Sequence, residues 1–307
     1  MSNRHSWLIL AALAVGAWSA GSSAQGTFHL YVLDTKTGVV TQATQPMDYD
    51  LYNASFSNDG KKLVHDLVLA GAPTQWLGIT DIRTRTTTHL YLGGVQLEGD
   101  NAVWSPNGQY IAYSNWMDWS RDPSGATPIR VVVMSAPASP PVLVRNWGLE
   151  PSWSNNSRRL AFDDWLDGHI GTVGLDGSET NLGVLGAYGC NPSYSPDGKL
   201  IVFQRYECFW GAAGPLMAIP VNERGEALGA PYPITSGAYY ADKASFSKDG
   251  KTIVFSGNVS DPNEWGLYTV SVYGGNPVKL HDVVGSPEYN AAYSKDGRYV
   301  VFSSSGQ

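Results

Sequence analysis

The hydrophobic and polar positions of the chain follow one short pattern that recurs six times. In the copy SYSPDGKLIVF (193–203), an aromatic residue precedes Ser195, then Asp197 and Gly198 follow, and apolar alternation resumes at Ile201. The equivalent serine stands at positions 57, 105, 154, 195, 247 and 294, a spacing of 41–52 residues. An Asp-Gly or Asn-Gly pair between apolar alternations is a strong hairpin signal, because these residues tolerate positive φ. The pattern therefore predicts six equivalent β-hairpins.

Each hairpin also predicts its own strand register. With Asp197 and Gly198 at the turn, Tyr194 faces Ile201, and Phe203 lies diagonally on the same face of the sheet. Two further strand-like runs follow each hairpin, as in GLYTVSVYGGNPVKLH (266–281), where YGGN is the turn. Each unit is therefore expected to be a sheet of four short antiparallel strands.

Four strands in every 40–50 residues or so are typical of one blade of a β-propeller. The six hairpins therefore predict an all-β, six-bladed propeller over residues 25–307. We expect the N-terminal strands (about 28–43) to pair with the C-terminal hairpin (about 288–304) and so to close the ring. An open β-sandwich is the alternative, but sandwiches have no fixed internal repeat.

The first 24 residues differ from the repeats. Arg4 lies in a short polar start, the apolar run WLILAALAVGAWSA follows, and small residues end at Ala24. This order is typical of a secretory signal peptide, and the apolar run is too short to favour a retained anchor. We expect residues 1–24 to be a signal peptide and residues 25–307 to be soluble, in the periplasm or secreted. The sequence leaves the oligomeric state open.

Charge and cysteine content narrow the possible partners. The net charge of −7 argues against nucleic acid as a partner, because nucleic-acid-binding proteins usually carry a basic patch.

The two cysteines, Cys190 and Cys208, bracket the inner hairpin of the fourth unit. Because oxidising compartments preserve disulfides, we expect these two residues to be bonded if their geometry permits.

The letters of the repeat resemble those of a known family. PSYSPDGKLIVF (192–203) and LYTVSVYGGNPVKL (267–280) are similar to the repeats of TolB-like, WD-like propellers, over essentially all of 27–307. The resemblance implies a propeller fold and an exported protein. Similar repeats occur in the propellers of prolyl-oligopeptidase-type peptidases and in oligogalacturonate lyases.

The chain departs from each of these relatives. The Tol-system protein has an α/β domain before its propeller, whereas only about two strands precede the first hairpin here. The peptidases have a G-x-S-x-G nucleophile motif, which this sequence lacks. The lyases bind a metal through several histidines, and only five histidines follow residue 24, namely His29, His65, His89, His169 and His281. The resemblance therefore implies an architecture and leaves the activity open.

Two sets of positions are expected around the mouth of the propeller channel. In a propeller, the loops that enter the first strand and those that join the second and third strands lie on one face, here called the funnel face. Four residues before each repeated serine stand Asn53, Asn101, Glu150, Asn191, Lys243 and Asn290, and one step earlier stand Tyr52, Asp100, Leu149, Cys190, Asp242 and Tyr289. Asparagine at these positions is also explained by a purely structural turn. Glu150 and Lys243 are therefore the stronger indications of a binding site. A divalent cation such as calcium beside Asp100, Glu150 or Asp242 is a further possibility.

Aromatic side chains are concentrated in the loops of the same face. Second-to-third-strand loops contain Trp116, Trp119, Trp165, Tyr206 and Trp210, and entry loops contain Trp147 and Tyr240. Such rings suit sugars, peptide aromatics and protein hot spots, whereas Trp76 and Trp265 are equally well explained by packing between blades. His169 stands near Asp163 and Asp164, where an imidazole beside a carboxylate suits a general base or a metal ligand.

We therefore predict a non-catalytic binding propeller that captures a saccharide or a peptide segment of an envelope protein, with no resident cofactor. The alternative is a polysaccharide lyase or a glycoside-cleaving enzyme that uses funnel carboxylates and His169. The predicted ligand-binding residues are Asn53, Asp100, Asn101, Trp116, Trp119, Trp147, Glu150, Trp165, His169, Tyr206, Trp210, Tyr240, Asp242, Lys243 and Tyr289.

Overall fold

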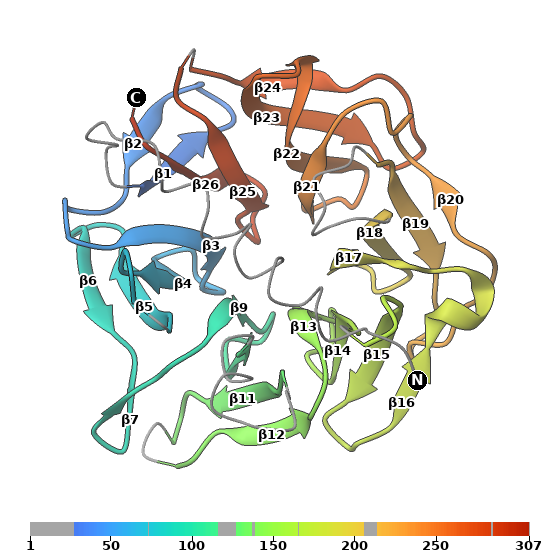
Figure 1. Ribbon diagram of the computed structural model, residues 1–307, viewed down its shortest axis with the longest axis horizontal. Helices are drawn as coiled ribbons and strands as arrows, with labels where there is room; N and C mark the ends of the chain where they lie inside the picture. The colour runs from blue at the N-terminus through green and yellow to red at the C-terminus, as the bar shows by residue number, and fades with distance from the viewer. Residues whose placement is uncertain are drawn as a thin grey trace.

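The computed structural model describes residues 28–72, 74–115, 127–136, 139–164, 166–205, 214–283 and 285–306. Within these ranges the chain forms six four-stranded antiparallel sheets arranged around a central axis (Figure 1). The predicted all-β, six-bladed propeller is confirmed. The predicted signal peptide, residues 1–24, lies outside the described residues. No helix in the described part of the chain is long and apolar enough to cross a membrane.

Five blades are each built from four consecutive strands, with the first strand at the axis and the fourth at the periphery. Blade 1 contains β3 (Asp50–Phe56), β4 (Lys62–Val68), β5 (Trp76–Asp81) and β6 (Thr86–His89); blade 2 contains β9 (Asp100–Trp104), β10 (Tyr110–Ser114), β11 (Ile129–Val133) and β12 (Val142–Arg145); blade 3 contains β13 (Leu149–Trp153), β14 (Arg159–Asp163), β15 (Ile170–Gly174) and β16 (Glu179–Asn181). Blade 4 contains β17 (Gly189–Tyr194), β18 (Leu200–Arg205), β19 (Leu216–Pro220) and β20 (Tyr232–Pro233); blade 5 contains β21 (Ala241–Phe246), β22 (Thr252–Asp261), β23 (Glu264–Ser271) and β24 (Val278–His281). A small hairpin of β7 (Tyr91–Leu92) and β8 (Val95–Gln96) follows blade 1, and a 3-10 helix, η3 (Leu182–Leu185), follows β16.

Blade 6 is assembled from both ends of the chain. Strand β1 (His29–Asp34) pairs antiparallel with β26 (Tyr299–Ser304) along its whole length, and β2 (Val40–Gln42) and β25 (Glu288–Tyr293) complete the sheet. The predicted closure of the ring is therefore confirmed. Because the last strand of the chain hydrogen-bonds to the first, the ring cannot open without the loss of a sheet ladder.

The repeated serine and acid form the same contacts in every hairpin turn. The Ser195 hydroxyl donates to the Asp197 carboxylate over 2.7 Å and accepts the backbone N–H of Leu200 over 2.9 Å. Gly198 has a φ of 73°, in the left-handed region that residues with a side chain rarely adopt. The predicted register of Tyr194 opposite Ile201 is confirmed. The same serine-to-acid or serine-to-amide bond links Ser57 to Asp59, Ser105 to Asn107, Ser154 to Asn156, Ser247 to Asp249 and Ser294 to Asp296. The face that bears these turns is called the hairpin face below.

Neighbouring blades are joined by apolar side chains and by one recurring hydrogen bond. Tyr194, Ile201 and Phe203 belong to a single buried cluster, as predicted for one face of the blade. The hydroxyl of Ser152 in blade 3 accepts the backbone N–H of Tyr194 in blade 4 over 3.1 Å. Equivalent bonds run from Trp104 to Ser55 and from Tyr293 to Ser245. These contacts fix the inner strands side by side around the axis.

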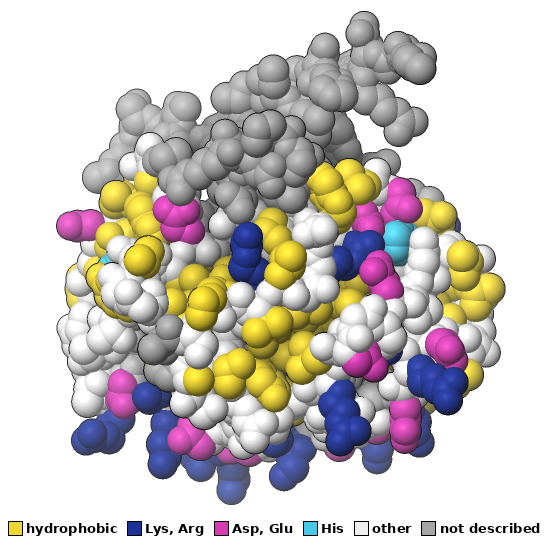
Figure 2. Space-filling model, turned by 90° about the horizontal axis from the view of Figure 1, so that it is seen from below, with side chains coloured by type: hydrophobic (Ala, Val, Ile, Leu, Met, Phe, Trp, Pro, Cys, Tyr) yellow, Lys and Arg dark blue, Asp and Glu magenta, His cyan; other side chains and the backbone are white. Residues whose placement is uncertain are grey.

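Basic side chains are concentrated on the hairpin face. The turns between first and second strands contain Lys61, Arg158, Lys199, Lys251 and Arg298. Figure 2 views the disc edge-on and shows Lys and Arg side chains gathered along its lower edge. The buried acids Asp66, Asp100 and Asp163 lie toward the opposite end of the inner strands. The net charge of −7 is therefore distributed unevenly along the axis.

Candidate functional site

The innermost strand has an irregularity at the same place in all six blades. The register with the second strand shifts there, and the residue at the shift has a φ between 49° and 58°. These residues, called the bulge ring, are Asn53, Asn101, Glu150, Asn191, Lys243 and Asn290. Asparagine adopts the left-handed region more readily than other residues with a side chain, so four positions have a backbone explanation. Glu150 and Lys243 have no such backbone explanation, because residues of these types rarely adopt the left-handed region. In this conformation each residue costs about 1–3 kcal/mol.

The bulge ring lines a central cavity of about 280 Å³. The walls of this cavity extend from the ring to Asn58, Pro106 and Lys295 in the hairpin turns, so the cavity lies on the hairpin side of the ring. The structure therefore brings four of the predicted site residues together at the axis. These are Asn53, Asn101, Glu150 and Lys243.

The charged members of the bulge ring bridge the channel. The Lys243 ammonium donates a hydrogen bond to the Asn101 side chain, and its Nζ lies 3.5 Å from Glu150 Oε1. The other carboxylate oxygen of Glu150 accepts the backbone N–H of Asn191 over 2.7 Å. The Asn191 amide in turn donates to Asp242 over 2.8 Å. One lysine and one glutamate thus connect blades 2, 3, 4 and 5.

A second polar layer lies next to the bulge ring on its funnel side. The residues that precede the bulges, called the upper ring, are Tyr52, Asp100, Leu149, Cys190, Asp242 and Tyr289. Opposite them in the second strands stand Asp66, Ser114, Asp163, Gln204, Ser256 and Ser303, all polar and all buried. The two aspartates of this second-strand ring, Asp66 and Asp163, were absent from the predicted ligand-binding set. The sequence contained a signal, since each residue follows the aromatic position of the repeat, which His65 fills in blade 1.

Burial and mutual repulsion raise the pKa values of the acids in these layers. Burial, followed by the charge of Asp100, raises the pKa of Asp66 to about 8. Burial also raises the pKa of Asp242 to about 6, although Lys243 opposes this, and burial with the Glu150 charge raises the pKa of Asp163. Burial alone would lower the pKa of Lys243, but the carboxylates of Glu150 and Asp242 raise it. Among the described residues, the acidic groups of these layers outnumber the ammonium group of Lys243 that acts on them.

Aromatic side chains form a continuous arc beside this acidic layer. Ring centroids lie 5.9 Å apart between Tyr240 and Trp265, 5.2 Å between Trp265 and Tyr289, 5.9 Å between Tyr289 and Phe28, and 5.2 Å between Phe28 and Tyr52. All five rings of this aromatic arc are half-buried. Tyr240 and Tyr289 were predicted site residues. Trp265 contacts rings from two blades, which fits the packing alternative, whereas Trp76 packs in an apolar cluster with blades 1 and 6.

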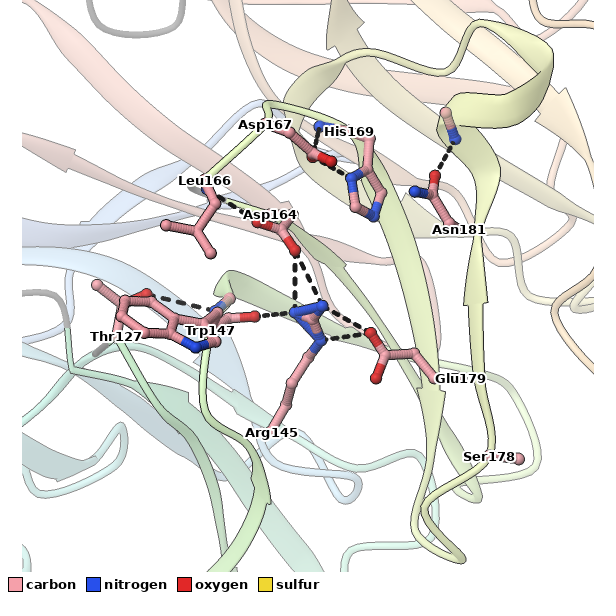
Figure 3. A network of polar contacts seen from close by, with 12 residues as sticks. Thr127, Arg145, Trp147, Asp164, Leu166, Asp167, His169, Ser178, Glu179 and Asn181 are labelled. Atoms are coloured by element: carbon pink, nitrogen blue, oxygen red, sulfur yellow. Dashed lines mark hydrogen bonds and ion pairs between the residues drawn. The ribbon is translucent and has the colours of Figure 1, made fainter. Parts of the chain in front are cut away.

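His169 belongs to a different cluster, which Figure 3 shows from close by. It directly precedes β15, the third strand of its sheet, and its Nδ1 contacts the Asp167 carboxylate. Arg145 donates two hydrogen bonds to Asp164, at 3.1 and 2.9 Å, and pairs with Glu179 at 2.6 Å. The possible ligand atoms of Asp164, Asp167 and His169 lie within 4.8 Å of one another. The Arg145 guanidinium already neutralises Asp164, so this cluster contains its own cation.

The remaining predicted site residues are only partly placed. Trp147 is half-buried, and its backbone carbonyl accepts a hydrogen bond from Arg145. Trp116, Trp119, Trp165, Tyr206 and Trp210 lie outside the described residues. Cys190 is disulfide-bonded, and its predicted partner Cys208 also lies outside the described residues.

Comparisons with known proteins agree with this architecture. The family model described as the dipeptidyl peptidase IV (DPP IV) N-terminal region matches residues 216–307. A protein assigned as TolB from Agrobacterium tumefaciens is similar in structure, with a TM-score of 0.68, 21% identity, and coverage of 92% of this chain and 98% of that chain. TolB from Acinetobacter baumannii gives a TM-score of 0.58 and 16% identity over 98% of this chain and 69% of that chain.

A further structural neighbour is an oligogalacturonate lyase from Vibrio parahaemolyticus, with a TM-score of 0.52 and 13% identity over 89% of this chain and 78% of that chain. None of the curated protein sequences matches this chain. At these identities the likeness shows the fold alone. The predicted resemblance to TolB-like propellers is confirmed at that level.

Proposed function

We propose that this chain is an exported, non-catalytic binding propeller whose funnel face captures an extended segment of another envelope protein. The observation that carries the proposal is the aromatic arc next to the acidic layer at one end of the axis. Half-buried aromatic rings bind with a large contact area and little loss of side-chain freedom. Polar groups placed beside such rings fix the orientation of a ligand.

The position of the arc favours a chain segment over a flat protein surface. The arc extends over blades 5, 6 and 1 around the axis, and its members Tyr52 and Tyr289 belong to the upper ring of the channel. An extended segment that enters at the axis contacts several blades at once, whereas a flat partner touches only the rim. A saccharide also suits aromatic rings and carboxylates, so it is the second ligand class to test.

The placement of His169 favours binding over catalysis. An acid and a base that cleave a glycosidic bond must flank the same substrate atoms. His169 lies beside the third strand of blade 3 and contacts Asp167, whereas Asp66, Asp163 and Asp242 lie in the first and second strands around Lys243. The imidazole and the axial carboxylates thus belong to separate clusters.

The test is a parallel screen of the purified protein against a displayed library of random decapeptides and a glycan array. We expect enriched peptides that bind saturably and quench tryptophan fluorescence. The variant Trp265→Ala/Tyr289→Ala should lose this binding, and Tyr273→Ala, at an exposed ring outside the arc, should retain it. Enrichment of glycans alone would overturn capture of a protein segment and identify saccharides as the ligand class. Turnover of an oligosaccharide, or silence in both screens, would overturn the proposal.

A further inference from the structure

We infer that the captured segment is anchored by a basic side chain, a lysine or an arginine, in the part of the upper ring that contains Tyr52 and Tyr289. This inference rests on the proposed function and names the chemistry that its ligand must carry. Three observations support it: the order of side chains around the upper ring, the excess of hydrogen-bond acceptors and the balance of charge. Acidic segments, neutral segments and metal ions also match the site less well.

The upper ring places two aromatic residues between two acids. Blades 5, 6, 1 and 2 follow one another around the axis, and they contribute Asp242, Tyr289, Tyr52 and Asp100 in that order. The Phe28 ring lies within 5.9 Å of Tyr289 and 5.2 Å of Tyr52, which joins the two tyrosines into one surface. Cations are attracted to aromatic faces, and the attraction increases when the site excludes water. A cationic group placed there lies next to aromatic rings, between the blades that carry Asp242 and Asp100.

The layer has more buried acceptors than donors. Asp66 stands directly opposite Tyr52 and is fully buried; its Oδ2 accepts from Asn53 over 2.6 Å. By distance and angle, Asp66 Oδ1, Asn53 Oδ1, Asn191 Oδ1 and Asp163 Oδ1 accept no hydrogen bond within the described ranges, although the backbone N–H of Asn101 acts on the Asp66 carboxylate and lowers its pKa. The Ser303 hydroxyl, opposite Tyr289, is the one unpaired group in the described part of this layer that can donate. Buried polar atoms are almost always paired, and an unpaired one destabilises the folded protein. A ligand that supplies several N–H donors complements this layer.

The charge balance points to the same ligand. In the part of the chain that the structure describes, Lys243 is the ammonium that acts on the acids of this layer, and it already contacts Asn101 and Glu150. The raised pKa values of Asp66 and Asp242 reflect carboxylates that burial makes costly to ionise. A bound cation stabilises the ionised carboxylates, so binding should release protons between about pH 6 and pH 8.

The alternative ligands match the site less well. An acidic segment would meet a surplus of carboxylates, and a neutral one would leave that surplus uncompensated. Within the described ranges, the acidic and histidine side chains spaced closely enough to hold a metal ion are Asp164, Asp167 and His169, which lie outside this layer. An inorganic cation would also make no use of the aromatic arc. A basic side chain satisfies the acids and covers the rings together.

The decapeptide screen tests this inference when the consensus is read position by position. We expect one position to be dominated by lysine and arginine, and the best peptide to bind at least tenfold more weakly when that residue becomes glutamine. Asp242→Asn should weaken binding of this peptide about tenfold and reduce its dependence on salt. Asp81→Asn, on the hairpin face, is the matched control and should change neither.

The outcomes separate the inference from the function on which it rests. A neutral or acidic consensus overturns the basic anchor and leaves peptide capture intact. A basic consensus whose affinity is unchanged by Asp242→Asn also overturns the inference, because the contact then lies elsewhere. Enrichment of no peptide overturns the proposed function itself. A charge-swapped pair, Asp242→Lys with glutamate at the anchor position, should recover part of the lost affinity if the two groups meet.

Discussion

The ammonium group of Lys243 crosses the channel and donates a hydrogen bond to the side chain of Asn101, in the blade directly opposite. The two residues are 142 positions apart in the sequence. The same ammonium lies 3.5 Å from Glu150 Oε1. Lys243 and Glu150 have φ values of 49° and 52°, where the other four blades have asparagine. The contacts across the channel explain why charged residues stand at two positions that otherwise favour asparagine.

Removal of the bridging ammonium should destabilise the fold. Lys243→Ala leaves Glu150 and Asp242 without their cation, and loss of one partner from a buried ion pair costs about 3–5 kcal/mol. Because the Lys243 and Glu150 side chains are 22% and 19% exposed, we expect the lower part of that range. Urea unfolding measures the change in the free energy of unfolding. Lys248→Ala, at an exposed turn, is the control, and equal stability of both variants would contradict the prediction.

A ring composed entirely of asparagine should recover part of this loss. Glu150→Asn and Lys243→Asn each relieve backbone strain but break the Glu150–Lys243 pair. The double variant removes both members of this pair and leaves Asp242 without its cation. The double variant should therefore be more stable than the sum of the single changes predicts, with a coupling of about 1–3 kcal/mol. A double-mutant cycle from urea unfolding measures this coupling. Additive single effects would show that the two charges do not interact.

Stability should fall as the pH rises toward 8, and Asp66 should be one cause. Its pKa is about 8 in the folded protein, well above the value near 3.9 expected in the unfolded chain. Between these values the folded state binds the proton more tightly, so one such group lowers stability by up to about 1.4 kcal/mol per pH unit. Urea unfolding from pH 5 to pH 8 should show a shallower loss in Asp66→Asn than in the parent protein. Parallel curves for the two proteins would refute this assignment.

The serine of each hairpin turn should contribute a similar amount to the free energy of unfolding. Ser195→Ala removes a hydroxyl that donates to Asp197 and accepts from Leu200, so we expect a loss of about 1–2 kcal/mol. Ser247→Ala, in the equivalent turn of blade 5, should cost a similar amount. Ser236→Ala, at an exposed loop, is the control and should change the unfolding midpoint little. Unequal losses at the two turns would show that the repeats differ in energy despite their shared geometry.

The sequence alone determined the number of blades, the turn chemistry and the closure of the ring. Each hairpin is encoded within about ten contiguous residues, because Ser195, Asp197 and Gly198 form their contacts inside one turn. The strand register follows from the same local pattern. Closure followed from incomplete units at the two ends, which together make one blade.

Local patterns also located the bulge ring, since its members stand at a fixed distance before the repeated serine. The same patterns did not identify Asp66 and Asp163 as part of the axial layer. Asp163 is the last residue of β14 and Asp66 lies two residues before the end of β4, and a polar residue near a strand end gives no signal of its own. The small hairpin of β7 and β8 was missed as well, because it occurs once and belongs to no repeat.

Only the tertiary structure decided which of these side chains meet. Phe28 and Tyr289 lie near opposite ends of the chain, and their rings come within 5.9 Å because blade 6 joins the two termini. Lys243 reaches Asn101 because six similar blades place them on opposite sides of a narrow axis. Hydrogen bonds within a turn depend on neighbouring residues and are therefore legible in sequence. Contacts across the channel depend on the closed ring, which exists only once all six blades have packed.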